Sequence, residues 1–178
     1  GTFHSLFSRI LRVEAHRIGY PNDFSIYDTD DSKSLIREII KSLNLDTKVY
    51  NVGAVRSRIS TAKSNLMSPQ AYAQNDDLVG LDKMNRRPMI FKIYELYVKK
   101  CKRAGAMDFD DLLLQMFNLL YKNPDNVRAK YQSQFTYVMV DEFQDTNSLQ
   151  YEILKLLTVF DGSPHNVCIV GDDAQSIY

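Results

Sequence analysis

Carboxylate and amide side chains follow two short apolar runs near the C-terminal end of this 178-residue chain. The run 137–140 leads directly into the sequence DEFQDT at residues 141–146, and the run 167–170 leads into GDDAQSIY at residues 171–178. Carboxylates at the end of a parallel strand are suited to hold a magnesium ion that bridges nucleotide phosphates. The two clusters together therefore predict a nucleotide site, although an isolated Asp-Glu pair is more simply part of an acidic loop.

Each polar residue of the two clusters suits a different task. Asp141 can hold the hydration shell of Mg²⁺, and Glu142 can accept a proton from an attacking water as a general base. Gln144 and Asp145 are candidates for orienting the nucleotide or relaying its state, and the amide of Gln175 is suited to sense a γ-phosphate. Together these residue types predict hydrolysis of a nucleoside triphosphate.

The apolar runs predict the elements that position these side chains. We expect strands over 136–141 and 166–171, joined by a helix over 147–159 that buries several large side chains: Tyr151, Ile153, Leu154, Leu156 and Leu157. Strand, helix and strand in this order form a βαβ unit with parallel strands and a right-handed connection. Both clusters should therefore emerge at the same edge of the sheet.

Most of the remaining chain has the apolar spacing of helices. The first helix follows Thr2 and ends at Gly19, and Asp30 or Asp31 is expected to cap the second. Further helices are predicted over 52–66, 69–73, 87–103, 108–122 and 127–134, with a polar connector over 74–82. At least one of Asp110 and Asp111 is expected to cap its helix.

Composition limits the class of protein. The 44% hydrophobic content suits a packed core, and neither a secretory leader nor an apolar run long enough to span a bilayer is present. Cys101 and Cys168 complete no disulfide or metal framework, which favours a reducing, cytoplasmic location. The zero net charge combines +7 over 1–107 with −7 over 108–178, so the basic part is a candidate surface for a polyanion, although solvated helix faces explain such a count equally simply.

Four segments resemble motifs of UvrD/Rep/PcrA-type superfamily 1 DNA helicases. DEFQDT and GDDAQSIY resemble two motifs of that family, TFHS at residues 2–5 resembles a third, and DFDDL at 108–112 resembles another, in the family's order. The resemblance covers the whole chain. It implies an α/β fold in which a partial RecA-like P-loop NTPase parallel sheet, from residues 1–20 and 106–178, carries a mostly helical inserted 1B-like subdomain over 21–105.

The resemblance also implies residue roles and partners. Asp141 would coordinate Mg²⁺, Glu142 would activate water, and Gln175 would couple the γ-phosphate of ATP to movement. Thr2, Phe3, His4 and Tyr178 would lie along single-stranded DNA, where an aromatic ring can stack on a base. Core packing is the alternative for Phe3 and Tyr178, and a structural hydrogen bond is the alternative for His4. The basic inserted helices, with Arg86, Arg87, Lys99, Lys100, Lys102 and Arg103, are candidates for contacts with duplex DNA.

Two features of the sequence differ from the family pattern. No G-x-x-x-x-G-K-[ST] phosphate-binding loop occurs, and Ala174 stands where many relatives have Asp. We therefore expect a helicase fragment that needs the remainder of its chain, including a second RecA-like domain, for 3′-to-5′ translocation and unwinding, and that is inactive alone. The alternatives are a DNA-binding or interaction module that has lost motor activity, and part of a helicase-nuclease.

Overall fold

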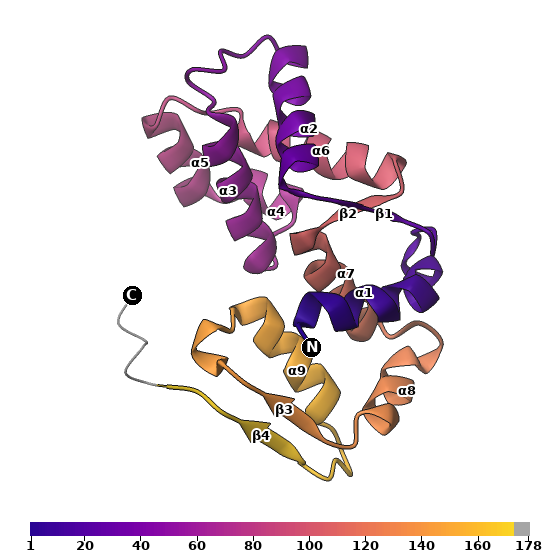
Figure 1. Ribbon diagram of the computed structural model, residues 1–178. Coiled ribbons are helices and arrows are strands. Elements are labelled where there is room, and N and C mark those ends of the chain that lie inside the picture. The colour runs from indigo at the N-terminus through magenta and orange to yellow at the C-terminus, as the bar shows by residue number, and fades with distance from the viewer. Residues whose placement is uncertain (173–178) are drawn as a thin grey trace. The chain divides into compact units, whose positions relative to one another are not determined.

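The computed structural model describes residues 1–172, which fall into two compact units (Figure 1). The terminal unit combines Gly1–Gly19 with the chain from Leu113 onward, and the central unit comprises Tyr20–Leu112. Helix α7, Phe109–Lys122, begins in the central unit and continues in the terminal unit. No helix among the described residues has the length and apolar character needed to cross a membrane.

The terminal unit is built from helices and one parallel strand pair. Besides the later turns of α7, its elements are α1 (Phe3–Glu14), η1 (Ala15–Ile18), η2 (Pro124–Asn126), α8 (Val127–Gln134), β3 (Val138–Val140), η3 (Phe143–Asp145), α9 (Ser148–Thr158) and β4 (Val167–Ile169).

The predicted βαβ unit is present. Strands β3 and β4 pair in parallel, with Val138 opposite Val167 and Val140 opposite Ile169, and α9 connects them along the chain. Both strands are shorter than the sequence predicted. The parallel register brings the ends of the two strands to one edge, so the segments that follow Val140 and Ile169 emerge together as expected.

Helix α9 begins at a capping box and buries one stripe. The Asn147 side chain accepts from Gln150 N at 2.8 Å, and the Gln150 side chain accepts from Asn147 N at 3.0 Å. The buried residues are Leu149, Ile153 and Leu157, spaced four apart. The prediction that Tyr151 lies inward was wrong: it is 49% exposed, because it lies two residues from the buried stripe and so on the other side of the helix.

The central unit is mostly helical. Its elements are β1 (Ser25–Tyr27), α2 (Thr29–Ser42), α3 (Val52–Ser64), α4 (Pro69–Ala73), α5 (Asp76–Met84), α6 (Ile90–Arg103), β2 (Ala106–Asp108) and the first turn of α7. Its core gathers side chains from α2, α3, α4 and α6 and from the loop before α3: Ile36, Ile39, Ile40, Tyr50, Val55, Ile59, Ala62, Tyr72, Ile90, Ile93, Tyr94, Tyr97 and Cys101.

Two features of the central unit differ from the sequence predictions. The expected connector over 74–82 contains helix α5, whose Asn75 cap accepts from Leu78 N at 2.9 Å and whose first turn carries Asp76 and Asp77. The parallel pair β1–β2, with Ser25 opposite Ala106, was not predicted, because each strand has only three residues. Gly105 precedes β2 with φ +61°, and a Cβ there would lie 2.9 Å from Pro21 Cγ, so glycine is needed at this turn.

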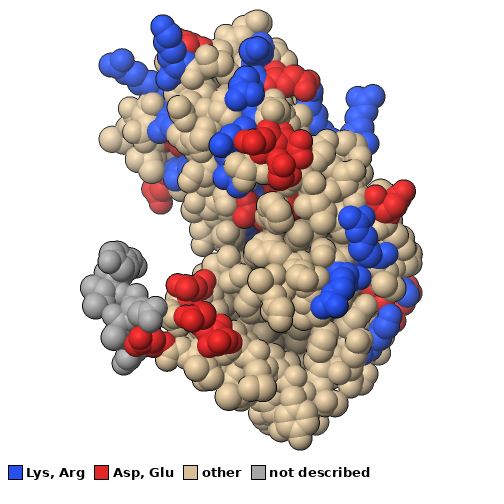
Figure 2. Space-filling view, viewed as in Figure 1, with Lys and Arg blue, Asp and Glu red and all other residues tan. Residues whose placement is uncertain are grey.

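Charged side chains of both signs lie on the surface of each unit. Figure 2 shows many Lys and Arg side chains over the helices of the central unit, with Asp and Glu side chains among them, and a group of Asp and Glu side chains on the terminal unit. Several of the basic groups have acidic partners within their own unit: Lys99 contacts Glu95 at 2.5 Å, and Lys100 contacts Glu38. The central unit carries 15 Lys and Arg against 13 Asp and Glu, because Asp108, Asp110 and Asp111 belong to it, so its net charge of +2 is smaller than the +7 counted over residues 1–107.

Candidate functional site

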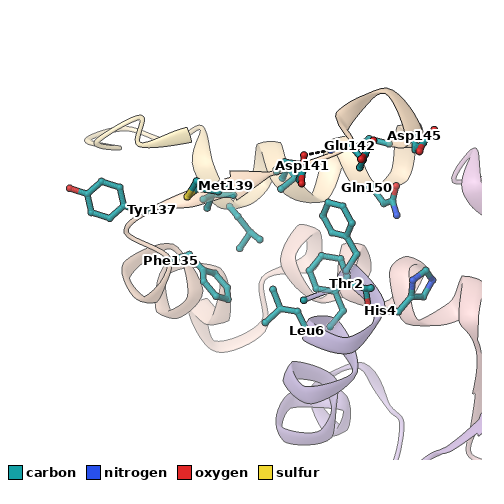
Figure 3. Close-up of a pocket in the computed structure, with 18 residues that line it drawn as sticks. Thr2, His4, Leu6, Phe135, Tyr137, Met139, Asp141, Glu142, Asp145 and Gln150 are labelled. Carbon is teal, nitrogen blue, oxygen red and sulfur yellow. Dashed lines mark hydrogen bonds between the residues drawn. The ribbon is translucent and has the colours of Figure 1, made fainter. Parts of the chain in front are cut away.

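A pocket of about 630 Å³ opens in the terminal unit (Figure 3). Its walls come from the N-terminal segment and the first turns of α1, from β3 and the segment after it, and from α9. Six residues that the sequence singled out line this one pocket: Thr2, Phe3, His4, Asp141, Glu142 and Asp145. The fold therefore brings the two ends of the predicted site together, although more than 130 residues separate them in the chain.

The carboxylates of Asp141 and Glu142 lie directly after β3, on exposed residues. Asp141 Oδ1 accepts from Glu142 N at 2.9 Å, which turns the backbone at this point. Glu142 has φ 52° and ψ 44°, a left-handed conformation that a residue with a side chain adopts only at a cost of about 1 kcal/mol or more.

The short helix η3 fixes the rest of the DEFQDT segment. Asp145 N donates to Glu142 O at 3.0 Å, and Phe143 N donates to Val170 O, beyond the end of β4, at 3.1 Å. The Gln144 amide does not line the pocket; it contacts Glu142 and the backbone of Asp172. Gln175 and Tyr178 lie outside the described residues, so their predicted roles remain predictions.

The TFHS residues form the start of α1. Thr2 caps the helix, with its Oγ1 accepting from Ser5 N at 3.2 Å. Phe3 is half-buried, its ring centroid lies 5.6 Å from that of Phe7, and His4 is half-buried as well. Thr2 therefore has a structural role of its own, and Phe3 combines packing with a position in the pocket wall.

An ion-pair cluster anchors α1 to α8 and so supports this wall. The buried Glu14 carboxylate accepts from Lys130 Nζ at 2.5 Å, from Arg17 Nε at 2.7 Å and from the Tyr131 hydroxyl at 3.1 Å. Burial disfavours the charged form, but these donors outweigh it and lower the pKa of Glu14. Sequence reasoning missed this cluster because Lys130 and Tyr131 lie 116 and 117 residues from Glu14 in the chain.

A second buried cluster lies in the central unit. Lys63, on α3, is fully buried and contacts Asp108 Oδ2 at 2.7 Å and Asp111 Oδ1 at 2.8 Å, while the Tyr97 hydroxyl donates to Asp108 at 2.8 Å. Asp108 and Asp111 also accept from each other's backbone N–H, at 2.7 and 3.2 Å, which caps α7 and confirms the capping role expected for Asp111. The DFDDL motif is thus a capped helix start locked to α3.

The cluster holds two carboxylates but only one ammonium, and this imbalance shifts the pKa values of its members. Burial of two carboxylates beside a single ammonium raises the pKa of Asp111 to about 6. Burial also opposes ionisation of Asp108, but the attraction and hydrogen bond of Lys63 dominate there and lower its pKa. Burial disfavours the charged form of Lys63, but the two carboxylates outweigh it and raise the pKa of Lys63 well above its ordinary value.

The carboxylates in the pocket wall are oxygen donors of the kind that Mg²⁺ prefers. Among residues 1–172, no group of three or more His, Cys, Asp or Glu side chains is arranged to hold a metal by itself. Magnesium in nucleotide sites is commonly held through one or two carboxylates, with phosphate oxygens and water completing the shell. The Asp141 carboxylate, exposed directly after β3 and in the pocket wall, could supply one oxygen ligand of such a shell.

Comparison with known proteins places the chain in a family. Residues 1–178 match the UvrD/REP helicase N-terminal domain, and the chain belongs to this family.

Among the curated relatives it is similar to the ATP-dependent DNA helicase PcrA of Leuconostoc citreum, 39% identical over 177 residues, which covers 99% of this chain and 22% of the relative. It is also 40% identical over 177 residues to the ATP-dependent DNA helicase PcrA of Staphylococcus aureus strain Mu50, with 99% and 23% covered. The chain therefore spans less than a quarter of the length of these relatives.

Proposed function

We propose that this chain is part of an ATP-dependent DNA helicase that couples ATP hydrolysis to 3′-to-5′ translocation on single-stranded DNA and to unwinding of duplex DNA. The names of the relatives support ATP and DNA as its ligands. One observation carries the proposal furthest: the parallel pairing of β3 and β4 brings Asp141 and Glu142 to the same sheet edge as Gly171 and Asp172, with which the GDDAQSIY sequence begins.

In this proposal the two units have different tasks. The terminal unit is part of a RecA-like nucleotide-binding domain, and the central unit is an inserted accessory subdomain whose basic surface approaches duplex DNA. The remaining length of the protein would supply the phosphate-binding loop and a second RecA-like domain. The N-terminal residues Thr2, Phe3 and His4 would contact single-stranded DNA from the wall of the pocket.

Each side chain of the site then has a chemical role. The Asp141 carboxylate holds Mg²⁺, which when bound neutralises charge on the phosphate oxygens of ATP. The Glu142 carboxylate accepts a proton from the water that attacks the γ-phosphorus, while the bond to the ADP oxygen breaks. Gln175 senses the γ-phosphate, and Asp145 helps to orient the nucleotide. The exposed position of Glu142 in the pocket wall leaves its carboxylate accessible to water.

The test is DNA-stimulated ATP hydrolysis by the full-length protein with Glu142→Gln. We expect turnover to fall by about 10²- to 10⁴-fold, because a positioned general base typically contributes that much to a rate. The matched control is Glu152→Gln, which makes the same change on the surface of α9, where Glu152 contacts Lys155 at 3.7 Å. A wild-type protein that binds DNA but hydrolyses no ATP would favour a DNA-binding module without motor activity.

A further inference from the structure

Gln144 makes two side-chain hydrogen bonds to two different segments. Its amide Nε2 donates to Glu142 Oε2 at 2.5 Å, and its Oε1 accepts from the backbone N–H of Asp172 at 3.1 Å. Glu142 precedes it in the segment after β3, whereas Asp172 lies 28 residues further on, after β4. One half-buried side chain therefore joins the candidate general base to the neighbouring segment of the site.

These bonds extend the backbone pairing of the strands. Beyond the last paired residues, Val170 N donates to Val140 O at 2.8 Å, and Phe143 N donates to Val170 O at 3.1 Å. The bond from Asp172 N to Gln144 is the next connection in the same direction. It is made by a side chain because the backbone turns away at Glu142, where φ is 52°.

The residue before Asp172 leaves room for this contact. A Cβ at Gly171 would lie 3.0 Å from Gln144 Oε1 and 3.5 Å from the Cβ of Phe143. A separation of 3.0 Å is tighter than ordinary van der Waals contact, so the Gln144 amide would have to move if Gly171 carried a side chain. Gly171 thus lies where the segment after β4 contacts the segment after β3.

Glu142 needs a partner of this kind. An exposed carboxylate in a short segment has several rotamers of similar energy, and a general base acts only within hydrogen-bond reach of the proton that it removes. A hydrogen bond to a charged group is among the stronger ones in proteins and selects one of these rotamers. The second bond, from Asp172, fixes the orientation of the Gln144 amide itself.

We propose that Gln144 is a positioning residue for ATP hydrolysis, which holds the Glu142 carboxylate in place and ties it to the segment after β4. This assignment replaces the nucleotide-contacting role that the sequence suggested for Gln144. The inference rests on the proposed function, because the geometry of Glu142 matters for turnover only where Glu142 is the base.

The first test measures ATP hydrolysis by the full-length protein with Gln144→Met, which keeps the length of the side chain but removes both hydrogen bonds. We expect kcat to fall about tenfold while KM for ATP stays within about twofold, because an oriented base acts on the chemical step rather than on binding. The control is Gln115→Met on α7, where the Gln115 amide accepts only a local bond from Asn118 at 3.2 Å among the contacts described.

Gln144→Glu separates the two bonds. A glutamate keeps an oxygen that accepts from Asp172 N, but it cannot donate to Glu142. We expect kcat to fall at least as far as in Gln144→Met. A wild-type kcat in either variant would overturn the proposal. So would a large rise in KM with an unchanged kcat, because that result identifies a nucleotide ligand instead.

A second measurement needs neither ATP nor turnover. Backbone hydrogen exchange at Asp172 in the nucleotide-free protein should accelerate severalfold in Gln144→Met, should stay near wild type in Gln144→Glu, and should accelerate in Gly171→Ala, where the new Cβ displaces the amide. Unchanged exchange in Gln144→Met would overturn the link. If Glu142→Gln retained wild-type turnover, the proposed function would fail instead, and the two failures are thereby distinguished.

Discussion

Lys63 is a charged side chain with no exposed surface, held between two carboxylates in the central unit. Burying one ammonium and two carboxylates is costly, and the cost is offset only while all three are present and hydrogen-bonded. This cluster connects α3 to the start of α7, so a single residue controls how two elements far apart in the sequence are joined.

Removing the ammonium should therefore destabilise the protein strongly. We expect Lys63→Met to lower the free energy of unfolding by about 3–5 kcal/mol, because two buried carboxylates lose their counter-charge. Lys41→Met, at an exposed position of α2, should change it by less than about 0.5 kcal/mol. Urea denaturation of both variants measures the difference, and equal midpoints would contradict a structural role for Lys63.

The same cluster predicts a dependence of stability on pH. The folded pKa of Asp111 is raised from 3.8 to about 6, so its stabilising contribution is complete below pH 3.8 and is lost as the pH rises through 6. Between pH 7 and pH 5 the wild type should gain about 1 kcal/mol relative to Asp111→Asn. Asp108, whose pKa is lowered, and Lys63, whose pKa is raised, change charge outside pH 5–7 and so do not alter the stability difference between these two pH values. Parallel urea titrations at the two pH values test the difference, and the same slope in both proteins would refute it.

At the scale of elements, capping side chains fix the residue at which a helix begins. Helix α9 connects the two strands whose ends carry the candidate site, and its start depends on the reciprocal bonds of Asn147 and Gln150. We expect Asn147→Ala to cost about 1 kcal/mol of stability, as the loss of an N-cap typically does. Ser148→Ala, one residue along and exposed, is the control and should change little. Thermal unfolding of the two variants is the measurement, and indistinguishable transitions would show that the cap is dispensable.

Sequence periodicity predicted elements well where burial follows it. The stripe of Ile36, Ile39 and Ile40 on α2 was recognisable because local spacing reflects the buried side. The strands β3 and β4 were recognisable from their apolar residues, although β4 is exposed and only Val140 of β3 is buried. The helix over 76–84 was missed because it carries few buried residues, and its Asn75 cap was the available signal.

The contacts that complete the candidate site could not be predicted from residue spacing alone. The bond between Gln144 and Asp172 depends on strand register and on a side-chain rotamer, and neither is written in residue types. Lys63 reads as an ordinary helical lysine until the fold places Asp108 beside it, 45 residues further along the chain. Elements and motifs that reside in one segment were predictable, whereas contacts shared between segments needed the structure.

At the scale of the whole molecule, the exposed basic residues of the central unit are the feature with a functional consequence. Under the proposed function, Arg86 and Arg103, both exposed on the central unit, are candidates for phosphate contacts. Changing both to alanine in the full-length protein should weaken duplex binding and reduce the slope of log affinity against log salt by about 2. Lys122→Ala with Lys155→Ala, on the terminal unit, is the matched control. Fluorescence anisotropy across a salt series measures the slope, and an unchanged slope would exclude these arginines from the interface.

The strand β4 carries a thiol that makes it observable. Cys168 is exposed in this strand, whereas Cys101 is buried in the core of the central unit, where burial raises its pKa to about 12. Within these 178 residues a maleimide dye should therefore mark β4 selectively. The strand thus contains its own labelling site at the edge of the candidate site, and the rate at which Cys168 is labelled reports whether other parts of a longer protein cover it.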